Sequence, residues 1–300
     1  MCLEITEVPI VKTELLKIAF EVGGPEDGRP LLLLHGWPDD VRGWGLVAPL
    51  LHARGWRTVT PYLRGFGPTR FRLDETLRDG RGVALAQDAL DLADALELET
   101  FAVAGHDWGV RAAYILAGLF PERVSGIVAL ALAFQPRGAF RLPSFSQARR
   151  FWYQWFLALE HGPEALRADP KGFARIQWDT WSPTGWFDEA EFEATAKSFE
   201  NPDWSAITLH GYRSRWRTET TDPRYSGLQA RLGELETLST PTLMIQGASD
   251  FCDEPASSEG LERHFTGRYQ RIVLDGVGHF PPREAPEAVA GALDRHLRDV

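Results

Sequence analysis

Short apolar runs separated by helical patterns are the feature of this 300-residue sequence that most limits its fold. The runs are rich in Leu, Val, Ile and Ala and do not alternate with polar residues, which is typical of strands covered on both faces. Strands that alternate with helices indicate an α/β fold with a mostly parallel sheet and helices on both of its faces. The predicted strands are Leu31–Leu34, Thr58–Thr60, Phe101–Ala104, Ile127–Ala133, Leu243–Gln246 and Arg271–Leu274, and the predicted helices are Val83–Leu96, Val110–Phe120, Pro255–His264 and Pro286–Leu297.

The stretch from about residue 135 to 237 interrupts this alternation, because it contains helical patterns and no β run. It also holds seven of the 11 tryptophans. We interpret it as a helical lid that lines an apolar pocket, rather than a subdomain that uses Trp for packing alone. The predicted organisation is a core of residues 1–136 and 237–300 with a cap of residues 137–236, whose helices are expected at Ser146–Glu160, Asp188–Phe199 and Asp203–Trp216.

The charge balance and the longest apolar run exclude two classes of partner. Lys and Arg number 32 against 42 Asp and Glu, and this acidic balance opposes binding to nucleic acid. The longest apolar run, Ile127–Phe134, is too short for a bilayer, which requires about 20 residues. The interrupted N-terminal segment predicts no signal peptide, and Cys2 and Cys252 fit free thiols. We therefore expect a cytoplasmic protein without a membrane partner, as a monomer or homodimer.

The segment Gly105-His106-Asp107-Trp108-Gly109 places a carboxylate between a predicted strand and a predicted helix. The same strand–turn–helix layout with Ser is the nucleophile elbow of α/β-hydrolases. Two glycines leave room for a tight turn, and the helix N-terminus favours a negative charge. The segment predicts that Asp107 is a nucleophile, while the alternative is an Asp that only caps the helix.

Two further loops supply an acid and a base. Asp250 and His279 each follow a predicted strand, and the chain order is nucleophile, acid, histidine. Because the carboxyl ends of parallel strands meet at one edge of the sheet, Asp107, Asp250 and His279 are expected to converge there. The acid would orient the imidazole through its ring N–H, and Asp253 is the second candidate for that position.

The turn His35-Gly36-Trp37-Pro38 follows another predicted strand. The backbone N–H of Trp37, together with that of Trp108, is expected to form an oxyanion hole. His35 itself is expected to be structural. The alternative is a simple Gly–Pro turn.

Taken together, these motifs resemble the α/β-hydrolase superfamily and, within it, the epoxide hydrolases that use an Asp nucleophile. The resemblance covers nearly the whole chain and implies the α/β-hydrolase fold, with a mostly parallel central sheet and an inserted helical cap. The motifs that carry it are His35-Gly36-Trp37-Pro38 with Trp44 downstream, Gly105-His106-Asp107-Trp108-Gly109, the Asp250 loop with Pro255, and Gly278-His279-Phe280.

An Asp at the elbow favours a different chemistry from that of a Ser. A carboxylate is already ionised and attacks carbon directly, so that the intermediate is an alkyl ester of Asp107. His279 is then free to activate water against the carbonyl of that ester. This favours substrates with an electrophilic sp³ carbon, such as epoxides or alkyl halides, over esters and peptides.

The resemblance also implies two cap tyrosines that donate hydrogen bonds to the epoxide oxygen. Tyr153, followed by Gln154, and Tyr212, followed by Arg213, match those positions. A Tyr with a pKa near 10 is a neutral donor at pH 7. The predicted function is therefore hydrolysis of apolar or aromatic epoxides to vicinal diols. The alternative is that both tyrosines only pack in the cap. The residues expected to contact the substrate are Trp37, Trp108, Trp152 and Phe156.

A haloalkane dehalogenase with the same three residues is the alternative enzyme, and a non-enzymatic ligand receptor is a third hypothesis. Fluoroacetate dehalogenases carry Arg one and four residues after the nucleophile, where this chain has Trp108 and Arg111. Arg111 is therefore expected to be a surface or ion-pair residue. The eight His show no metal-ligand spacing and there is no nucleotide-binding glycine motif, so neither a metal nor a cofactor is expected.

Overall fold

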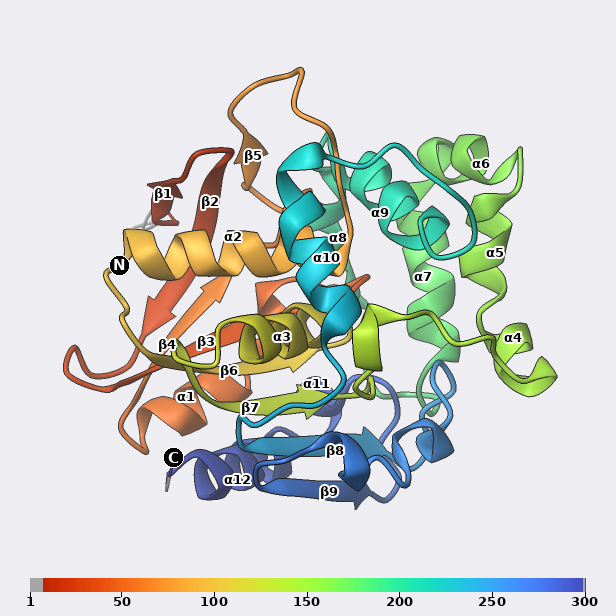
Figure 1. Ribbon diagram of the computed structural model, residues 1–300. Helices are drawn as coiled ribbons and strands as arrows, with labels where there is room; N and C mark the ends of the chain where they lie inside the picture. Colours follow the sequence, from red (N-terminus) through yellow and green to blue (C-terminus); the bar gives the residue numbers. More distant parts are fainter. Residues whose placement is uncertain (1–7, 299) are drawn as a thin grey trace, which may run out of the picture.

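A nine-stranded sheet forms the centre of the computed structural model, which describes residues 8–298 and 300 (Figure 1). The strand order is β1-β2-β4-β3-β6-β7-β8-β9, with β5 paired to β2. All neighbours from β4 through β9 are parallel, and β1, β2 and β5 add antiparallel pairs at one edge. The predicted fold class is confirmed. The strands are β1 Ile10–Lys12, β2 Leu16–Gly23, β3 Arg29–Leu34, β4 Trp56–Pro61, β5 Arg70–Phe71, β6 Phe101–His106, β7 Val124–Leu130, β8 Thr242–Gly247 and β9 Tyr269–Leu274.

Each of the six predicted strands is present, whereas β1, β2 and β5 were not predicted. These three carry exposed polar residues, so they lack the continuous apolar run of a strand buried on both faces. The strand predicted to extend to Ala133 ends at Leu130, because Ala131 has a φ of 71°, which is outside the β region.

Two layers of helices cover the sheet, and the side chains of one strand serve both layers. Leu32 and Leu34 of β3 face the core beneath α2 and α3, while Leu31 and Leu33 face the core beneath α1 and α12. Figure 1 shows α2 and α3 on one side of the sheet and α1 and α12 near the other. These helices are α1 Val47–His52, α2 Gly82–Ala95, α3 Trp108–Leu119 and α12 Pro286–Leu297.

Between β7 and β8 the described chain forms helices and no strand, as the sequence predicts. The helix predicted over 146–160 is divided in two at Phe151, and α6, α7 and α10 were not predicted. The cap boundaries at 137 and 236 remain a prediction. The helices are α4 Phe145–Arg150, α5 Trp152–Ala158, α6 Gly162–Ala168, α7 Pro170–Thr180, α8 Glu189–Ala196, α9 Trp204–Arg213 and α10 Ser226–Glu234.

The helix predicted at Pro255–His264 is wrong. The segment forms two short 3₁₀ turns, and Gly260 between them has a φ of +65°, which a right-handed helix cannot contain. The 3₁₀ turns of the described chain are Val41–Trp44, Pro136–Gly138, Lys197–Glu200, Pro223–Tyr225, Pro255–Ser258 and Glu262–His264, and the short helix α11 is Pro281–Glu284.

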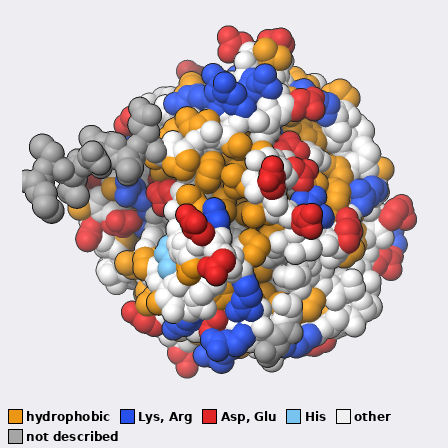
Figure 2. Space-filling model, turned by 90° about the vertical axis from the view of Figure 1, so that its left-hand side faces the viewer, with side chains coloured by type: hydrophobic (Ala, Val, Ile, Leu, Met, Phe, Trp, Pro, Cys, Tyr) orange, Lys and Arg blue, Asp and Glu red, His pale blue; other side chains and the backbone are white. Residues whose placement is uncertain are grey.

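The surface seen in Figure 2 carries acidic and basic side chains, with hydrophobic side chains exposed between them. Within the described residues, no helix has both the length and the apolar composition needed to cross a membrane. Cys252 is a buried free cysteine. Cys2 lies outside the described part of the chain, as do the first seven residues of the N-terminal segment for which no signal peptide is predicted.

Candidate active site

Asp107 lies at a sharp turn between β6 and α3. Its φ of 48° and ψ of −110° are strained for a residue other than glycine, and its side chain is buried. A Cβ on Gly105 would lie 2.5 Å from the backbone of Gly109, and one on Gly109 would lie 2.2 Å from the carbonyl oxygen of Leu34. The two glycines therefore allow the close backbone approach that the sequence predicts.

The structure brings His279 and Asp250 to Asp107. His279 Nδ1 is 2.8 Å from Asp250 Oδ2, and its Nε2 is 3.7 Å from Asp107 Oδ2. The other oxygen of Asp250 accepts backbone N–H groups from Cys252 and Asp253 at 2.8 and 2.9 Å. Asp253, the second candidate, instead accepts a hydrogen bond from Ser257. Of the two acids, Asp250 is the one positioned to orient the imidazole.

The pKa values of Asp107 and His279 are shifted by their buried neighbours. Burial alone would raise the pKa of Asp107, but the hydrogen bond and charge of His279 outweigh it and lower the pKa. Burial alone would lower the pKa of His279, but the Asp250 and Asp107 carboxyls hold it well above its usual value. The resting site therefore favours an ionised Asp107 beside a protonated His279.

The loop after β3 places a backbone donor on the carboxylate. The N–H of Trp37 donates to Asp107 Oδ1 across 2.9 Å. The N–H of Trp108 lies in the first turn of α3, where backbone donors have no acceptor within the helix. The indole of Trp37 donates to Thr208 Oγ1 of α9, which ties this loop to the cap. His35 is structural, as expected, because it accepts from the N–H of Leu63 at 3.0 Å and burial lowers its pKa to about 4.

Both predicted tyrosines are buried and lie in one aromatic cluster with Trp37. The rings of Tyr153 on α5 and Tyr212 on α9 are 5.1 Å apart, and they lie 5.7 and 4.9 Å from the ring of Trp37. The Tyr212 hydroxyl has no hydrogen-bond partner among the described residues. The Tyr153 hydroxyl accepts from Gln154 and lies 3.6 Å from the thiol of Cys252. Burial raises the pKa of both well above 10, so both stay neutral.

Trp152 and Phe156 lie farther out than Trp37 and Trp108. Both are half-buried and pack on Phe173 of α7, which in turn contacts Trp37. They therefore belong to the packing of α5 on α7, and their predicted contact with substrate remains a prediction.

Two neighbours of His279 were not predicted. The ring of Trp181 stands edge-on to the imidazole at 4.8 Å and lies 5.0 Å from Tyr153. Ser182 accepts the backbone N–H of His279 at 2.8 Å and donates to Glu284. Trp181 and Ser182 follow α7 in the cap, so no local motif links them to a loop about 100 residues further along.

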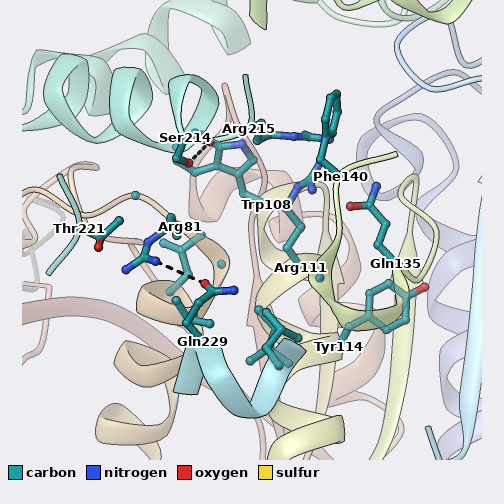
Figure 3. A pocket seen from close by; sticks show the side chains of 18 of the residues that line it. Arg81, Trp108, Arg111, Tyr114, Gln135, Phe140, Ser214, Arg215, Thr221 and Gln229 are labelled. Atoms are coloured by element: carbon teal, nitrogen blue, oxygen red, sulfur yellow. Dashed lines mark hydrogen bonds between the residues drawn. The ribbon is translucent and has the colours of Figure 1, made fainter. Parts of the chain in front are cut away.

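The ion-pair alternative for Arg111 is not met, whereas its partial exposure agrees with a position near the surface. It is half-buried on α3, and it forms no salt bridge with any of the described residues. Arg111 lines a cavity of about 630 Å³, and Trp108 is another of its lining residues (Figure 3).

Comparison with known proteins identifies the family. The model of the family described as "alpha/beta hydrolase fold" matches residues 29–286. The chain belongs to the α/β-hydrolase family. Epoxide hydrolase B of Mycobacterium tuberculosis is 32% identical over 154 residues, a match that covers 46% of this chain and 42% of that protein. The match thus spans less than half of that relative.

Two other members of the family match over almost their full lengths. A solved structure from Klebsiella pneumoniae, provisionally described as an epoxide hydrolase, has 37% identity, a TM-score of 0.90 and coverage of 97% of both chains. A fluoroacetate dehalogenase from a Burkholderia species is 31% identical over 93% of this chain and 90% of its own. This α/β-hydrolase is therefore similar to epoxide hydrolases and also to one dehalogenase.

Proposed function

We propose that this α/β-hydrolase is an epoxide hydrolase that forms vicinal diols through a covalent ester on Asp107. The observation that carries the proposal is the position of two buried, neutral tyrosines, Tyr153 and Tyr212, in the aromatic cluster beside an Asp–His–Asp arrangement. An epoxide oxygen leaves as an alkoxide that stays attached to the substrate, so it requires O–H donors. The similarity to epoxide hydrolases supports the same substrate class.

In the first step Asp107 attacks one carbon of the epoxide ring. Its Oδ1 is held by the N–H of Trp37, so Oδ2 is the oxygen free to attack. A C–O bond forms between Oδ2 and the carbon while the ring C–O bond breaks. Tyr153 and Tyr212 donate hydrogen bonds to the ring oxygen, and one of them gives it a proton. No base is needed, because the nucleophile is already ionised.

Ester formation makes Asp107 neutral and removes one of the charges that raise the pKa of His279, so the imidazole releases its proton to solvent. In the second step the neutral His279 removes a proton from water, and the resulting oxygen attacks the ester carbonyl of Asp107. The N–H groups of Trp37 and Trp108 hold the oxyanion, and loss of one such donor typically lowers the rate about 10²–10³-fold. Collapse of this intermediate breaks the bond between the carbonyl carbon and Oδ2, which leaves as the second diol oxygen and takes a proton from His279. The proton on the water-derived carboxyl oxygen returns to the tyrosine that was deprotonated in the first step, so Asp107 is ionised and both tyrosines are neutral again. Asp250 keeps the imidazole oriented throughout.

The test is the intact mass of the His279→Gln variant after mixing with styrene oxide. We expect a stable adduct with the full mass of the epoxide, because ester formation needs no base and ester hydrolysis does. The matched control is the double variant Asp107→Asn with His279→Gln, which should give no adduct. Turnover by His279→Gln at the parent rate would overturn the mechanism.

The second candidate function is dehalogenation, which the 31% identity to a fluoroacetate dehalogenase favours. The same experiment with 1-bromobutane and with fluoroacetate separates the two functions. A halide leaves the substrate, so its adduct has the mass of the substrate less the hydrogen halide. An adduct of that kind, with none from the epoxide, would assign the protein to the dehalogenases.

A further inference from the structure

The cavity of about 630 Å³ lies next to the proposed reaction centre and is lined by residues of the core and the cap. Trp108, which follows Asp107 directly, lines it, as does Gly211, which precedes Tyr212. The rings of Trp108 and Tyr212 are 5.3 Å apart. Trp108 therefore lies between the cavity and the nucleophile that precedes it in the chain, and Tyr212 stands beside Trp108.

Two arginines in this cavity have no acidic partner. Within the described chain neither Arg111 nor Arg215 forms a salt bridge, and Nη1 of Arg215 is buried without any hydrogen-bond partner. Asp107 and Asp253 influence them only from beyond ion-pair distance. A buried charged donor without a partner costs free energy, so this group requires an explanation.

The other charges around the cavity are already paired. Arg81 is held by Asp79 at 2.6 Å, and Glu219 lies between Arg213 and Arg217 at 2.9 and 3.0 Å. The uncompensated charge is therefore that of Arg111 and Arg215. Figure 3 shows both side chains directed to the region between Trp108 and Phe140. The guanidinium of Arg215 lies 4.6 Å from the centre of the Phe140 ring, which fixes its orientation.

Burial and the charge of a second arginine both act on Arg215. Burial, and then the charge of Arg111, lower the pKa of Arg215 to about 9. Arg215 is thus still charged at pH 7, but at a cost that an anion between the two groups would remove. Guanidinium groups bind carboxylates with short, charge-assisted hydrogen bonds, and the surrounding Trp and Phe side chains suit an aromatic body.

We propose that Arg111 and Arg215 bind a carboxylate of the substrate in this cavity, so that the enzyme acts on aryl epoxides that carry an acid group. This inference rests on the proposed function, because it names the substrate class of the same site. Arg111 follows Asp107 by one helical turn, a rise of about 6 Å along the axis. A carboxylate held there by a rigid aryl spacer would leave the epoxide carbon beside Asp107.

The first measurement is binding of benzoate by calorimetry, with benzamide as the neutral ligand of the same shape. We expect benzoate to bind at least about tenfold more tightly than benzamide, as charged hydrogen bonds require. Arg111→Met and Arg215→Met should each remove most of this difference. Arg175→Met is the matched control, since that arginine on α7 is paired with Asp179 and Glu189 and does not line the cavity, and it should leave benzoate binding unchanged.

The second measurement compares KM for 4-(oxiran-2-yl)benzoate and 4-(oxiran-2-yl)benzamide. A lower KM for the acid in the parent enzyme, and a ratio that approaches one in Arg111→Met and Arg215→Met, are the expected results. Equal binding of benzoate and benzamide by the parent protein, or equal KM values, would overturn the inference without affecting the proposed epoxide hydrolysis.

Two further outcomes show whether the bound carboxylate belongs to the substrate, and whether the carboxylate site or the proposed epoxide hydrolysis fails. Benzoate that binds through both arginines could inhibit turnover of 4-(oxiran-2-yl)benzamide noncompetitively. In that case the arginines bind a carboxylate that is not part of the substrate, and the substrate assignment is wrong. If benzoate binds through both arginines while neither epoxide is turned over, the proposed function fails and the carboxylate site stands.

Discussion

The backbone N–H of Trp37 donates to Oδ1 of Asp107 across 2.9 Å, so the loop after β3 holds the side chain that follows β6. The donor that would hold the oxyanion of the ester therefore already orients the carboxylate. Such preorganisation favours attack by the other oxygen and needs no rearrangement between the two steps.

Removal of the charge at residue 107 should abolish activity without unfolding the protein. Asn has an oxygen that still accepts the N–H of Trp37, and it tolerates a positive φ better than most residues other than Gly. We expect Asp107→Asn to lower turnover of styrene oxide by at least about 10³-fold, because it removes the nucleophile. Circular dichroism and the melting temperature check the fold, and residual activity above one tenth of the parent value would contradict the assignment.

The two candidate acids should differ strongly. Asp250→Asn removes the charge that orients His279, and we expect a loss of roughly 10²–10⁴-fold in turnover. Asp253→Asn should change turnover less than about threefold, since burial and the Asp250 charge already raise the pKa of Asp253 to about 7. The measurement is the steady-state turnover of both variants. A larger loss in Asp253→Asn than in Asp250→Asn would show that Asp253 orients His279.

The two tyrosines should share one role. Tyr153→Phe and Tyr212→Phe should each slow adduct formation in the His279→Gln background by about tenfold, and the double change by about 10²–10⁴-fold. Tyr225→Phe is the matched control: this buried Tyr accepts a hydrogen bond from Arg64 rather than facing Trp37. Time-resolved intact mass measures the rates, and a double variant as fast as the parent would refute the role.

The pH dependence should differ between the two chemical steps. In the free enzyme the carboxyls of Asp250 and Asp107 raise the pKa of His279, whereas alkylation makes Asp107 neutral and removes one of those charges. The pKa of His279 should therefore be lower in the ester than in the free enzyme, and ester hydrolysis should speed up with rising pH through that value. Ester formation should be flat until acid protonates Asp107, whose pKa is lowered. Single-turnover rates of the two steps against pH test this.

A buried carboxyl outside the proposed chemistry should make stability depend on pH. Burial and the neighbouring charge of Asp39 raise the pKa of Asp40 from 3.8 to about 7 in the folded protein. The folded state thus holds the proton more tightly than the unfolded state, so this contribution is complete below pH 3.8 and is lost as pH rises through about 7.

The corresponding experiment is urea unfolding of Asp40→Asn at several pH values. Between about pH 5 and 7.5 the variant should lose roughly 1–3 kcal/mol less stability than the parent protein, because Asn cannot ionise. Asp27→Asn, at an exposed position, is the control and should follow the parent. Parallel curves for Asp40→Asn and the parent would contradict the shifted pKa.

The sequence by itself determined the parallel sheet, the helical interruption and the elbow at Asp107, because these follow from local periodicity and from glycines at a tight turn. It also predicted that three loops would converge at one edge, since parallel strands all end there. It could not predict β1, β2 and β5, whose exposed residues give no apolar run. Nor could it exclude a helix at Pro255–His264, where one glycine in the left-handed region divides the segment.

Only the tertiary structure decided which acid meets His279, because Asp250 and Asp253 lie in one loop and their side-chain directions depend on the backbone around them. The same holds for Trp181 and Ser182, which reach His279 from the cap. The sequence likewise could not predict that Arg111 and Arg215 line the same cavity. An arginine's need for a counter-ion is local chemistry, but whether one lies nearby depends on how distant helices pack.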